Sequence, residues 1–428
     1  MISRRPLLIP FSLSLIVALS ACTGGKNVLL GSQSYRAATQ DILALPDGDV
    51  PTVSLQDPHT VRLFVDRDGD LYPAPLLPVL VPDSVRARTS ELVHDSVRTA
   101  KWLRGRTKSL QDVFDENPQA TVWKEVRTHL QLQADASWET IQDRLFARAA
   151  AAVRDAVDDV QGPLLVLVHG YNTVDAEYSY AHARQRVAPY LGRAAVLQLH
   201  WDGLQDNSIT NWKRAQFNFP QAGIALRRAL LSLAPTTPVR VFTHSSGGPV
   251  AAHAFWDASA TLPPDCDAPE PSYRGRRHYH EWVCTEDGID PPQFHDLRIG
   301  MIVPATSGLL FARYNARTSP LSRLVIGANP RDEAVSKSWL IPCTVKGSTC
   351  LSVRRSLLCD DEVARLRNRD IEVLIYDFSK SSGPGGNYGW RGEDHAWTTY
   401  LERDDWPRFA AALFGDAPVS DEAHDYCR

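Results

Sequence analysis

Apolar runs that alternate with helical stretches begin at residue 164 and constrain the fold more than any other feature of this 428-residue chain. The first run, Leu164–Val168, is apolar without interruption, which is typical of a parallel strand buried on both faces. The further strand-like runs are Ala195–Leu199, Val239–Thr243, Leu297–Val303, Leu324–Gly327 and Ile371–Tyr376. This alternation predicts an α/β fold with a doubly wound, mostly parallel sheet and right-handed crossovers.

Helical patterns fill the intervals between these runs. They cover Ala176–Leu191, a longer stretch ending near Leu233, a stretch that starts at Ser246, and a closing helix over Trp397–Phe414. Residues 85–160 are also helix-rich, and Gly162-Pro163 ends the last helix of this part. An apolar stripe at every fourth position marks that helix: Ile141, Leu145, Ala149, Val153 and Val157.

An N-terminal strand and turn precede the helix-rich part. Val61–Val65 has the pattern of a strand, and Asp68-Gly69 that of a tight turn. The acidic run Asp66–Asp70 suggests calcium at first sight, but its glycine stands fourth, whereas a calcium-binding EF-hand loop needs glycine at the sixth position. The pattern therefore favours a solvated hairpin tip.

The first 22 residues have the pattern of a processing signal. Arg4 and Arg5 precede the apolar stretch Pro6–Leu19, which leads into Leu19-Ser-Ala-Cys22. This ending resembles the bacterial lipobox, which implies lipidation of Cys22, cleavage before it and a membrane anchor of several acyl chains. The residue directly after Cys22 is not Asp, which by the same resemblance favours the periplasmic side of the outer membrane over the inner membrane. The alternatives are an ordinary signal peptide or an uncleaved anchor.

The net charge and the cysteine content exclude further classes of protein. The net charge of −4 argues against a dedicated nucleic-acid binder, which is usually strongly basic. No Cys-x-x-Cys pair occurs, so we predict neither a zinc site nor another metal site, and no cofactor. Six cysteines besides Cys22 permit three disulfides in an oxidising compartment, with about 15 possible pairings. They are Cys266, Cys284, Cys343, Cys350, Cys359 and Cys427.

The candidate nucleophile is Ser245. The segment Thr243-His-Ser245-Ser-Gly247 follows a strand and opens a helix, which is the setting of a nucleophile elbow, a sharp turn that presents the serine hydroxyl above the sheet. The turn needs small residues two positions before and after the serine, because neighbouring backbone passes close by. Gly247 meets this requirement, whereas Thr243 is larger than usual.

The acid and the base are expected later in the chain, in that order. Asp332 stands just past the strand that ends near Gly327, where it can orient an imidazole. His395 follows the last strand and its Gly/Ser-rich loop, and is the best candidate base among 13 histidines. Asp377 is the alternative acid, and Asp394 is disfavoured because side chains of sequence neighbours rarely point at each other.

Five motifs together resemble a bacterial branch of the α/β-hydrolase superfamily whose members are mostly recorded as hydrolases of unknown function. They are His169-Gly-Tyr-Asn-Thr173, Leu199-His-Trp201-Asp-Gly203, His244-Ser245-Ser-Gly-Gly248, Asn329-Pro-Arg-Asp332 and Asp394-His395, and the resemblance covers about residues 160–415. It implies an α/β-hydrolase fold in which Ser245 is the nucleophile, Asp332 the acid and His395 the base. The backbone N–H groups of Tyr171 and Ser246 would form the oxyanion hole, and His169 would order its loop.

The resulting expectation is a lipid-anchored serine hydrolase of the bacterial envelope, an esterase or lipase-like enzyme acting on a small-molecule or lipid ester. A thioesterase or peptidase differs only in the leaving group. The alternative is a non-catalytic envelope lipoprotein that uses the fold as a binding or scaffold module.

Five segments are expected along the chain: a signal peptide (1–21), a tether (22–60), a strand-plus-helical extension (61–160), the α/β-hydrolase domain (161–416) and a tail (417–428). The insert 263–295 joins a helix to the start of a strand, so we expect it away from the active site. The segments 306–320 and 379–393 leave the carboxyl ends of strands and should border the site. Tyr314, Trp390 and Trp397 are candidates for its apolar wall.

Overall fold

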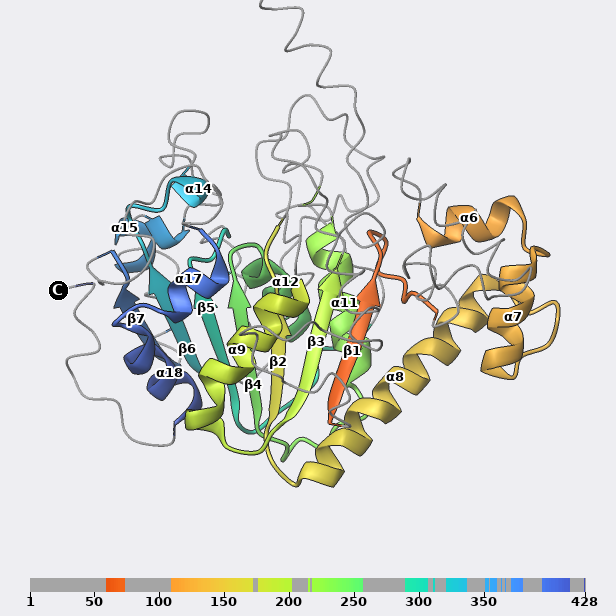
Figure 1. Ribbon diagram of the computed structural model, residues 1–428, viewed down its shortest axis with the longest axis horizontal. Coiled ribbons are helices and arrows are strands. Elements are labelled where there is room, and N and C mark those ends of the chain that lie inside the picture. The colour runs from red at the N-terminus through yellow and green to blue at the C-terminus, as the bar shows by residue number, and fades with distance from the viewer. Residues whose placement is uncertain are drawn as a thin grey trace, which may run out of the picture.

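Seven parallel strands form one sheet at the centre of the molecule, as Figure 1 shows. The order across the sheet is β1-β3-β2-β4-β5-β6-β7, and each neighbouring pair is parallel. The predicted α/β fold with a parallel sheet is therefore confirmed. The strands are β1 (Thr60–Val65), β2 (Leu164–Val168), β3 (Ala195–Trp201), β4 (Val239–His244), β5 (Leu297–Ile302), β6 (Leu321–Ala328) and β7 (Glu372–Asp377).

The computed structural model describes most of the chain between residues 59 and 415. The described parts are 59–73, 109–171, 176–201, 218–256, 289–306, 321–336, 351–353, 355–359, 371–379 and 395–415, with residues 215, 311, 363, 366 and 427. The signal, the tether up to residue 58 and the insert up to residue 288 lie outside these parts.

Helices cover both faces of the sheet because the chain reverses direction within it. The connection from β2 to β3 runs toward the β1 edge, whereas those from β1 to β2, β3 to β4 and β4 to β5 run the other way. Right-handed crossovers therefore place α9 on one face and α8, α11 and α12 on the other. On the first face α17 and α18 pack against α9, and on the second α11 packs against α8 and α12. These helices are α8 (Trp138–Val160), α9 (Ala176–Leu191), α11 (Asn218–Leu230), α12 (Gly247–Phe255), α17 (Trp397–Leu401) and α18 (Trp406–Phe414).

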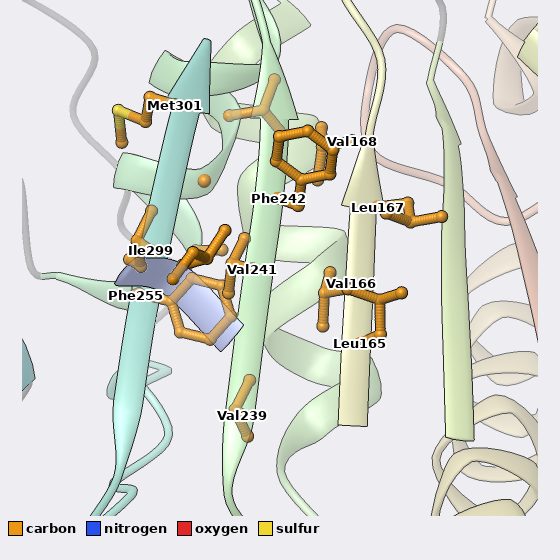
Figure 2. Close-up of a cluster of buried hydrophobic side chains, with 14 of the residues drawn as sticks. Leu165, Val166, Leu167, Val168, Val239, Val241, Phe242, Phe255, Ile299 and Met301 are labelled. Atoms are coloured by element: carbon orange, nitrogen blue, oxygen red, sulfur yellow. The ribbon is translucent and has the colours of Figure 1, made fainter. Parts of the chain in front are cut away.

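The central strands are apolar on both faces, and their side chains form the main hydrophobic core. Figure 2 shows side chains of β2, β4 and β5 gathered with Phe255 of α12. All five residues of β2 are buried, as its uninterrupted apolar sequence predicts. Burying one such Val, Leu or Phe side chain contributes about 1.5–3 kcal/mol, so this core holds the sheet and its helices together.

The predicted closing helix is wrong in one respect, because it consists of two helices. Residues 397–401 form α17 and residues 406–414 form α18, with a break between them. Pro407 lies in the first turn of α18, where its missing N–H does no harm, but it could not continue a preceding helix. Both helices pack on Phe242 of β4 through Trp397 and Trp406, with ring centroids 4.9 and 5.4 Å apart.

The helix-rich N-terminal part shares the sheet through β1, which pairs with β3. Three further elements follow: α6 (Leu110–Glu116), α7 (Thr121–Leu130) and the start of α8. They enclose a smaller core around Phe114, Trp123 and Trp138, whose rings lie 5.4–5.6 Å apart. The hydroxyl of Ser109 accepts from the N–H of Asp112 and the Asp112 carboxylate accepts from the N–H of Ser109, which caps α6. Short elements near β6 and β7 are α14 (Glu333–Ser336), the 3₁₀ turn Leu351–Val353 and α15 (Arg355–Cys359).

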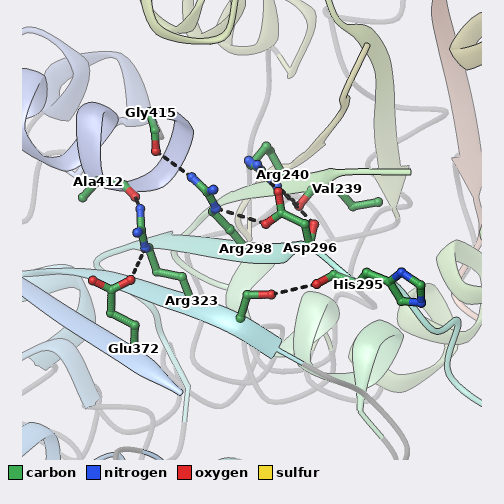
Figure 3. A network of polar contacts seen from close by, with 10 residues as sticks. Val239, Arg240, His295, Asp296, Arg298, Arg323, Glu372, Ala412 and Gly415 are labelled. Atoms are coloured by element: carbon green, nitrogen blue, oxygen red, sulfur yellow. Dashed lines mark hydrogen bonds and ion pairs between the residues drawn. The ribbon is translucent and has the colours of Figure 1, made fainter. Parts of the chain in front are cut away.

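Arginines at the amino ends of the strands hold the last helix against the sheet (Figure 3). Arg298 donates to the carbonyl oxygen of Gly415 at 2.6 Å, and Arg323 to that of Ala412 at 2.6 Å. These carbonyls belong to the C-terminal end of α18, which no intrahelical donor can reach. Burial opposes ionisation of Asp296, but Arg240 and Arg298 outweigh it and lower its pKa. The network is therefore charged and ties α18 to three strands.

One disulfide is present in the described part, between Cys359 of α15 and Cys427. It joins two of the six predicted cysteines across a sequence separation of 68 residues. Cys266, Cys284, Cys343 and Cys350 lie outside the described residues, as does Cys22. Within the described residues, no helix combines the length and the apolar character needed to cross a membrane.

The turn after β1 buries part of the acidic run. Asp68 is exposed, as predicted, but Asp66 is buried and accepts the N–H groups of Asp68, Asp70 and Leu110 at 2.8–3.0 Å. Asp70 accepts from the indole N–H of Trp138 at 2.9 Å. The prediction of a solvated tip therefore holds only for Asp68. Burial raises the pKa of Asp66 well above its ordinary value and that of Asp70 to about 6.

These raised pKa values predict a falling stability between about pH 4 and pH 6. In the unfolded chain these carboxyl groups ionise near pH 4, whereas in the folded chain Asp70 ionises only near pH 6. The free energy of unfolding therefore decreases as the pH rises through this window. Asp70→Asn removes one of the two carboxyls and should flatten this fall. At pH 7.5 we expect a gain of about 1 kcal/mol, measured by urea unfolding, because solvent screening reduces the roughly 3 kcal/mol of a two-unit shift.

The control is Asp158→Asn, the same change at an exposed position of α8. It should keep the pH dependence of the parent chain. An unchanged slope in Asp70→Asn would show that the turn does not carry this effect.

Candidate active site

Ser245 lies in a sharp turn between β4 and α12. Its φ angle is 51°, in the left-handed region that non-glycine residues rarely adopt. The turn is held by its own backbone: the Ser245 N–H donates to Ile302, and its carbonyl accepts from Gly248 and Ala305 at 3.2 and 3.0 Å. The elbow predicted from the sequence is therefore present. The larger residue Thr243 does not prevent it, because Thr243 is fully buried within the sheet beside Val168 and Met301.

Two glycines allow the backbone to pass close to Ser245. A Cβ atom on Gly247 would overlap the carbonyl oxygen of Val168 and lie 2.9 Å from that of His169. A Cβ atom on Gly170 would lie 2.9 Å from the Cβ of Ser245. The end of β2, the serine and the start of α12 thus fit together only with glycine at both positions.

The three predicted triad residues meet at the carboxyl edge of the sheet. The Ser245 hydroxyl and Nε2 of His395 are 2.9 Å apart, and Nδ1 of His395 is 2.7 Å from Oδ2 of Asp332. Ser245 follows β4, Asp332 follows β6, and His395 precedes α17. Ser245 and Asp332 are 5% and 2% exposed, whereas 19% of the His395 side chain is exposed. The imidazole is thus the member of the group most accessible from outside.

The carboxyl group of Asp332 is stabilised in its ionised form. Burial alone would raise its pKa, but His395, the hydroxyl of Tyr400 and the N–H of Val335 together outweigh burial and lower it. An ionised Asp332 accepts the proton on Nδ1 of His395, which leaves Nε2 as an acceptor facing the Ser245 hydroxyl. The electrostatics of the site therefore set the tautomer of the imidazole.

His169 is a buried residue that orders the loop after β2, as predicted. Its Nδ1–H donates to the carbonyl of Gly170 at 2.7 Å, and its Nε2 accepts the N–H of Trp201 at 3.3 Å. The imidazole stacks on the indole of Trp201, and burial lowers its pKa to about 3. Tyr180 adds a bridge: its hydroxyl accepts the His169 N–H and donates to the carbonyl of Leu199. A neutral His169 therefore fixes the loop that continues into Tyr171.

His244 lies between the imidazole of His395 and the indole of Trp397 in a chain of ring contacts. The His244 ring is 4.8 Å from that of His395 and stacks on the indole of Trp397 at 6.0 Å. Burial lowers the pKa of His244 well below its ordinary value, so it is neutral at physiological pH. Trp397 is 3% exposed and also packs on Phe242 of the core, and its place in the apolar wall of the site stays a prediction.

The remaining predicted site residues divide into three groups. Tyr171 is half-buried at the loop beside Ser245, and Ser246 is fully buried at the start of α12, which places both next to the elbow. Asp377 accepts the N–H and the hydroxyl of Ser379 at 2.9 and 2.5 Å, whereas Asp332 pairs with His395. Tyr314, Trp390 and Asp394 lie outside the described residues.

No group of three or more metal-ligating side chains is found where the structure is described.

Two residues that sequence reasoning missed complete the site. Tyr400 of α17 donates its hydroxyl to Oδ2 of Asp332 at 2.7 Å, and Asn329 donates its side-chain N–H to the hydroxyl of Tyr400 at 2.7 Å. Asn329 follows β6 at the same edge as Asp332, which is a signal that could have found it. Tyr400 has no such signal, because a tyrosine on an apolar helix face is equally compatible with a core position.

Comparisons with protein-family models, with curated proteins and with solved structures found no significant match. Fold and site geometry therefore carry the functional argument.

Gly247→Ala should destabilise the protein by about 1–3 kcal/mol, because the added methyl group collides with two backbone carbonyls that cannot rotate away. The measurement is urea unfolding at neutral pH. Gly248→Ala is the matched control, since its nearest neighbour is the Cβ of Pro304 at 3.1 Å and not a carbonyl. Equal losses in both variants would contradict the account of the elbow.

Proposed function

We propose that this protein is a serine hydrolase of the α/β-hydrolase type. The observation that carries the proposal is the continuous chain of contacts from Ser245 through His395 to Asp332, at 2.9 and 2.7 Å. The three residues come from distant segments that meet at one edge of the sheet. His395 is 150 residues from Ser245 and 63 residues from Asp332 in the sequence. This nucleophile–base–acid arrangement supports acyl transfer.

In the proposed reaction, Nε2 of His395 takes the hydroxyl proton while Oγ of Ser245 attacks the carbonyl carbon of an ester. The tetrahedral intermediate collapses, the ester C–O bond breaks, and His395 gives its proton to the departing alkoxide. Water then attacks the acyl-enzyme with His395 again as base, which releases the acid and restores the serine. Asp332 holds the imidazole in place and stabilises its charged form.

The oxyanion would be bound by the backbone N–H groups of Tyr171 and Ser246. Ser246 stands at the N-terminal end of α12, where the helix dipole favours negative charge. Gly170, which has no Cβ atom, leaves room for the loop that carries Tyr171 to pass close to Ser245. Each such donor contributes about two to three orders of magnitude to the rate in related chemistry.

A carboxylic ester is the proposed substrate class, as in an esterase or lipase. This choice rests on the triad and on the resemblance of the sequence motifs. Thioesters and peptides use the same nucleophile and base, so a substrate screen must include them.

We further propose a lipid-anchored location in the bacterial envelope, supported by Leu19-Ser-Ala-Cys22. Attachment would be through Cys22, with the periplasmic side of the outer membrane favoured.

A fluorophosphonate probe tests the enzymatic proposal on the chain that starts after Cys22. Such probes react with activated serines, so we expect the parent to be labelled and Ser245→Ala not to be labelled. His395→Ala and Asp332→Asn should react more slowly by roughly three to four orders of magnitude. Ser232→Ala, a hydroxyl near the surface that donates to Ala150, should react like the parent.

Absence of labelling in a folded parent chain would reject the hydrolase proposal in favour of a non-catalytic binding module. Labelling that survives in Ser245→Ala would place the reactive serine elsewhere.

The anchor is tested in cells with globomycin, which blocks cleavage of lipoprotein signals. Treated cells should accumulate a longer, unprocessed chain, and Cys22→Ala should give the same form without treatment. Normal processing under globomycin would exclude the lipobox and leave an ordinary signal peptide as the explanation.

A further inference from the structure

Tyr400 contacts Asp332, the proposed acid of the site. Its hydroxyl lies 2.7 Å from Oδ2 of Asp332, the same oxygen that accepts from His395 at 2.7 Å. Oδ1 of Asp332 accepts the N–H of Val335 at 3.1 Å. Two strong donors therefore share one oxygen of a carboxylate that is 2% exposed.

The direction of the hydrogen bonds around Tyr400 follows from the backbone. Oδ1 of Asn329 accepts the N–H of Arg331 at 3.0 Å, which fixes the orientation of the amide. The amide N–H of Asn329 therefore faces Tyr400 and donates to its hydroxyl oxygen at 2.7 Å. With that lone pair occupied, the hydroxyl proton points at Asp332. Because Tyr400 and Asn329 are fully buried, water does not compete for these groups.

We propose that Tyr400 is a positioning residue of this site: its hydroxyl, oriented by Asn329, draws negative charge from Oδ2 of Asp332 and so limits how strongly Asp332 binds the proton of His395. The proposal builds on the proposed function, in which His395 is the base. Without the Tyr400 hydroxyl, His395 is the stronger remaining donor to Oδ2, and the negative charge of this oxygen is directed at His395. The bond between His395 and Asp332 then shortens, and the charged form of the imidazole is favoured.

Other titratable groups near this chain do not change in the relevant pH range. His244 faces His395 from β4 and is neutral because burial lowers its pKa well below the ordinary value. His169, from the loop after β2, has a pKa lowered to about 3 by burial. Arg403 lies 5.3 Å from the ring centre of Tyr400 and is charged throughout. Among the described residues, the response to Tyr400→Phe therefore reports on Asp332 and His395.

Proton NMR gives a readout that does not depend on activity. The Nδ1 proton of His395, bound to a carboxylate, should give a resonance far downfield that is absent in His395→Ala. In Tyr400→Phe this resonance should move further downfield, because its bond to Asp332 strengthens. A merely structural role for Tyr400 would weaken or broaden the resonance instead.

The pH profile of fluorophosphonate labelling is the second readout. The labelling rate should fall at low pH, where His395 is protonated, and we call this fall the acidic limb. In Tyr400→Phe the acidic limb should move to higher pH by about half to one unit, because His395 keeps its proton up to a higher pH. Loss of folded protein alone would lower labelling equally at every pH and leave the limb in place. Asn329→Ala should shift the resonance and the acidic limb in the same direction as Tyr400→Phe, but by less. It replaces Tyr400→Phe as the test variant if that variant does not fold.

Tyr376→Phe is the matched control, a buried tyrosine of β7 whose ring packs on Phe409 at 6.1 Å. It should leave the resonance and the limb where they are in the parent. If the parent is not labelled, the hydrolase proposal fails while the resonance still decides the role of Tyr400. An unmoved resonance in folded Tyr400→Phe, or one that moves upfield, would overturn the inference.

Discussion

The close approach of the α12 N-terminus to the end of β2 is the contact on which the site depends. Gly247 passes so near the carbonyls of Val168 and His169 that no side chain fits between them. This contact fixes the serine in its left-handed conformation and sets it beside the loop that carries Tyr171. The parallel sheet positions the other residues of the site, because strands that run in one direction bring the residues after each strand to the same edge. The proposed nucleophile, acid and base, which come from distant segments of the chain, thereby lie together at this edge.

Much of this arrangement could be predicted from the sequence. Uninterrupted apolar runs such as Leu164–Val168 identify buried parallel strands, because only a strand covered on both faces tolerates them. Ser245, Asp332 and His395 could be selected because each lies near the end of such a run or before the helix that comes after it. Position relative to the strands, and not residue type, distinguished His395 from the other histidines.

The features that could not be predicted depend on contacts between distant segments. The order of the strands, with β1 next to β3, leaves no trace in the local pattern. Burial of Asp66 requires Leu110 as a partner 44 residues away, so an acidic turn looked solvated. Tyr400 has the pattern of an ordinary core residue until α17 is seen beside Asp332. The division of the closing helix was missed for a different reason, since Pro407 could have signalled it.

The arginines at the opposite edge of the sheet act on the proposed site from a distance. Arg298 and Arg323 fasten the end of α18, and α17 with Tyr400 precedes it, so His395 is located by the two helices on its C-terminal side. The position of the imidazole therefore depends on hydrogen bonds that two arginines make at the opposite end of the strands. A substitution of either arginine is expected to loosen α18 and, through α17, the imidazole, so a residue that never touches the proposed triad can still control it.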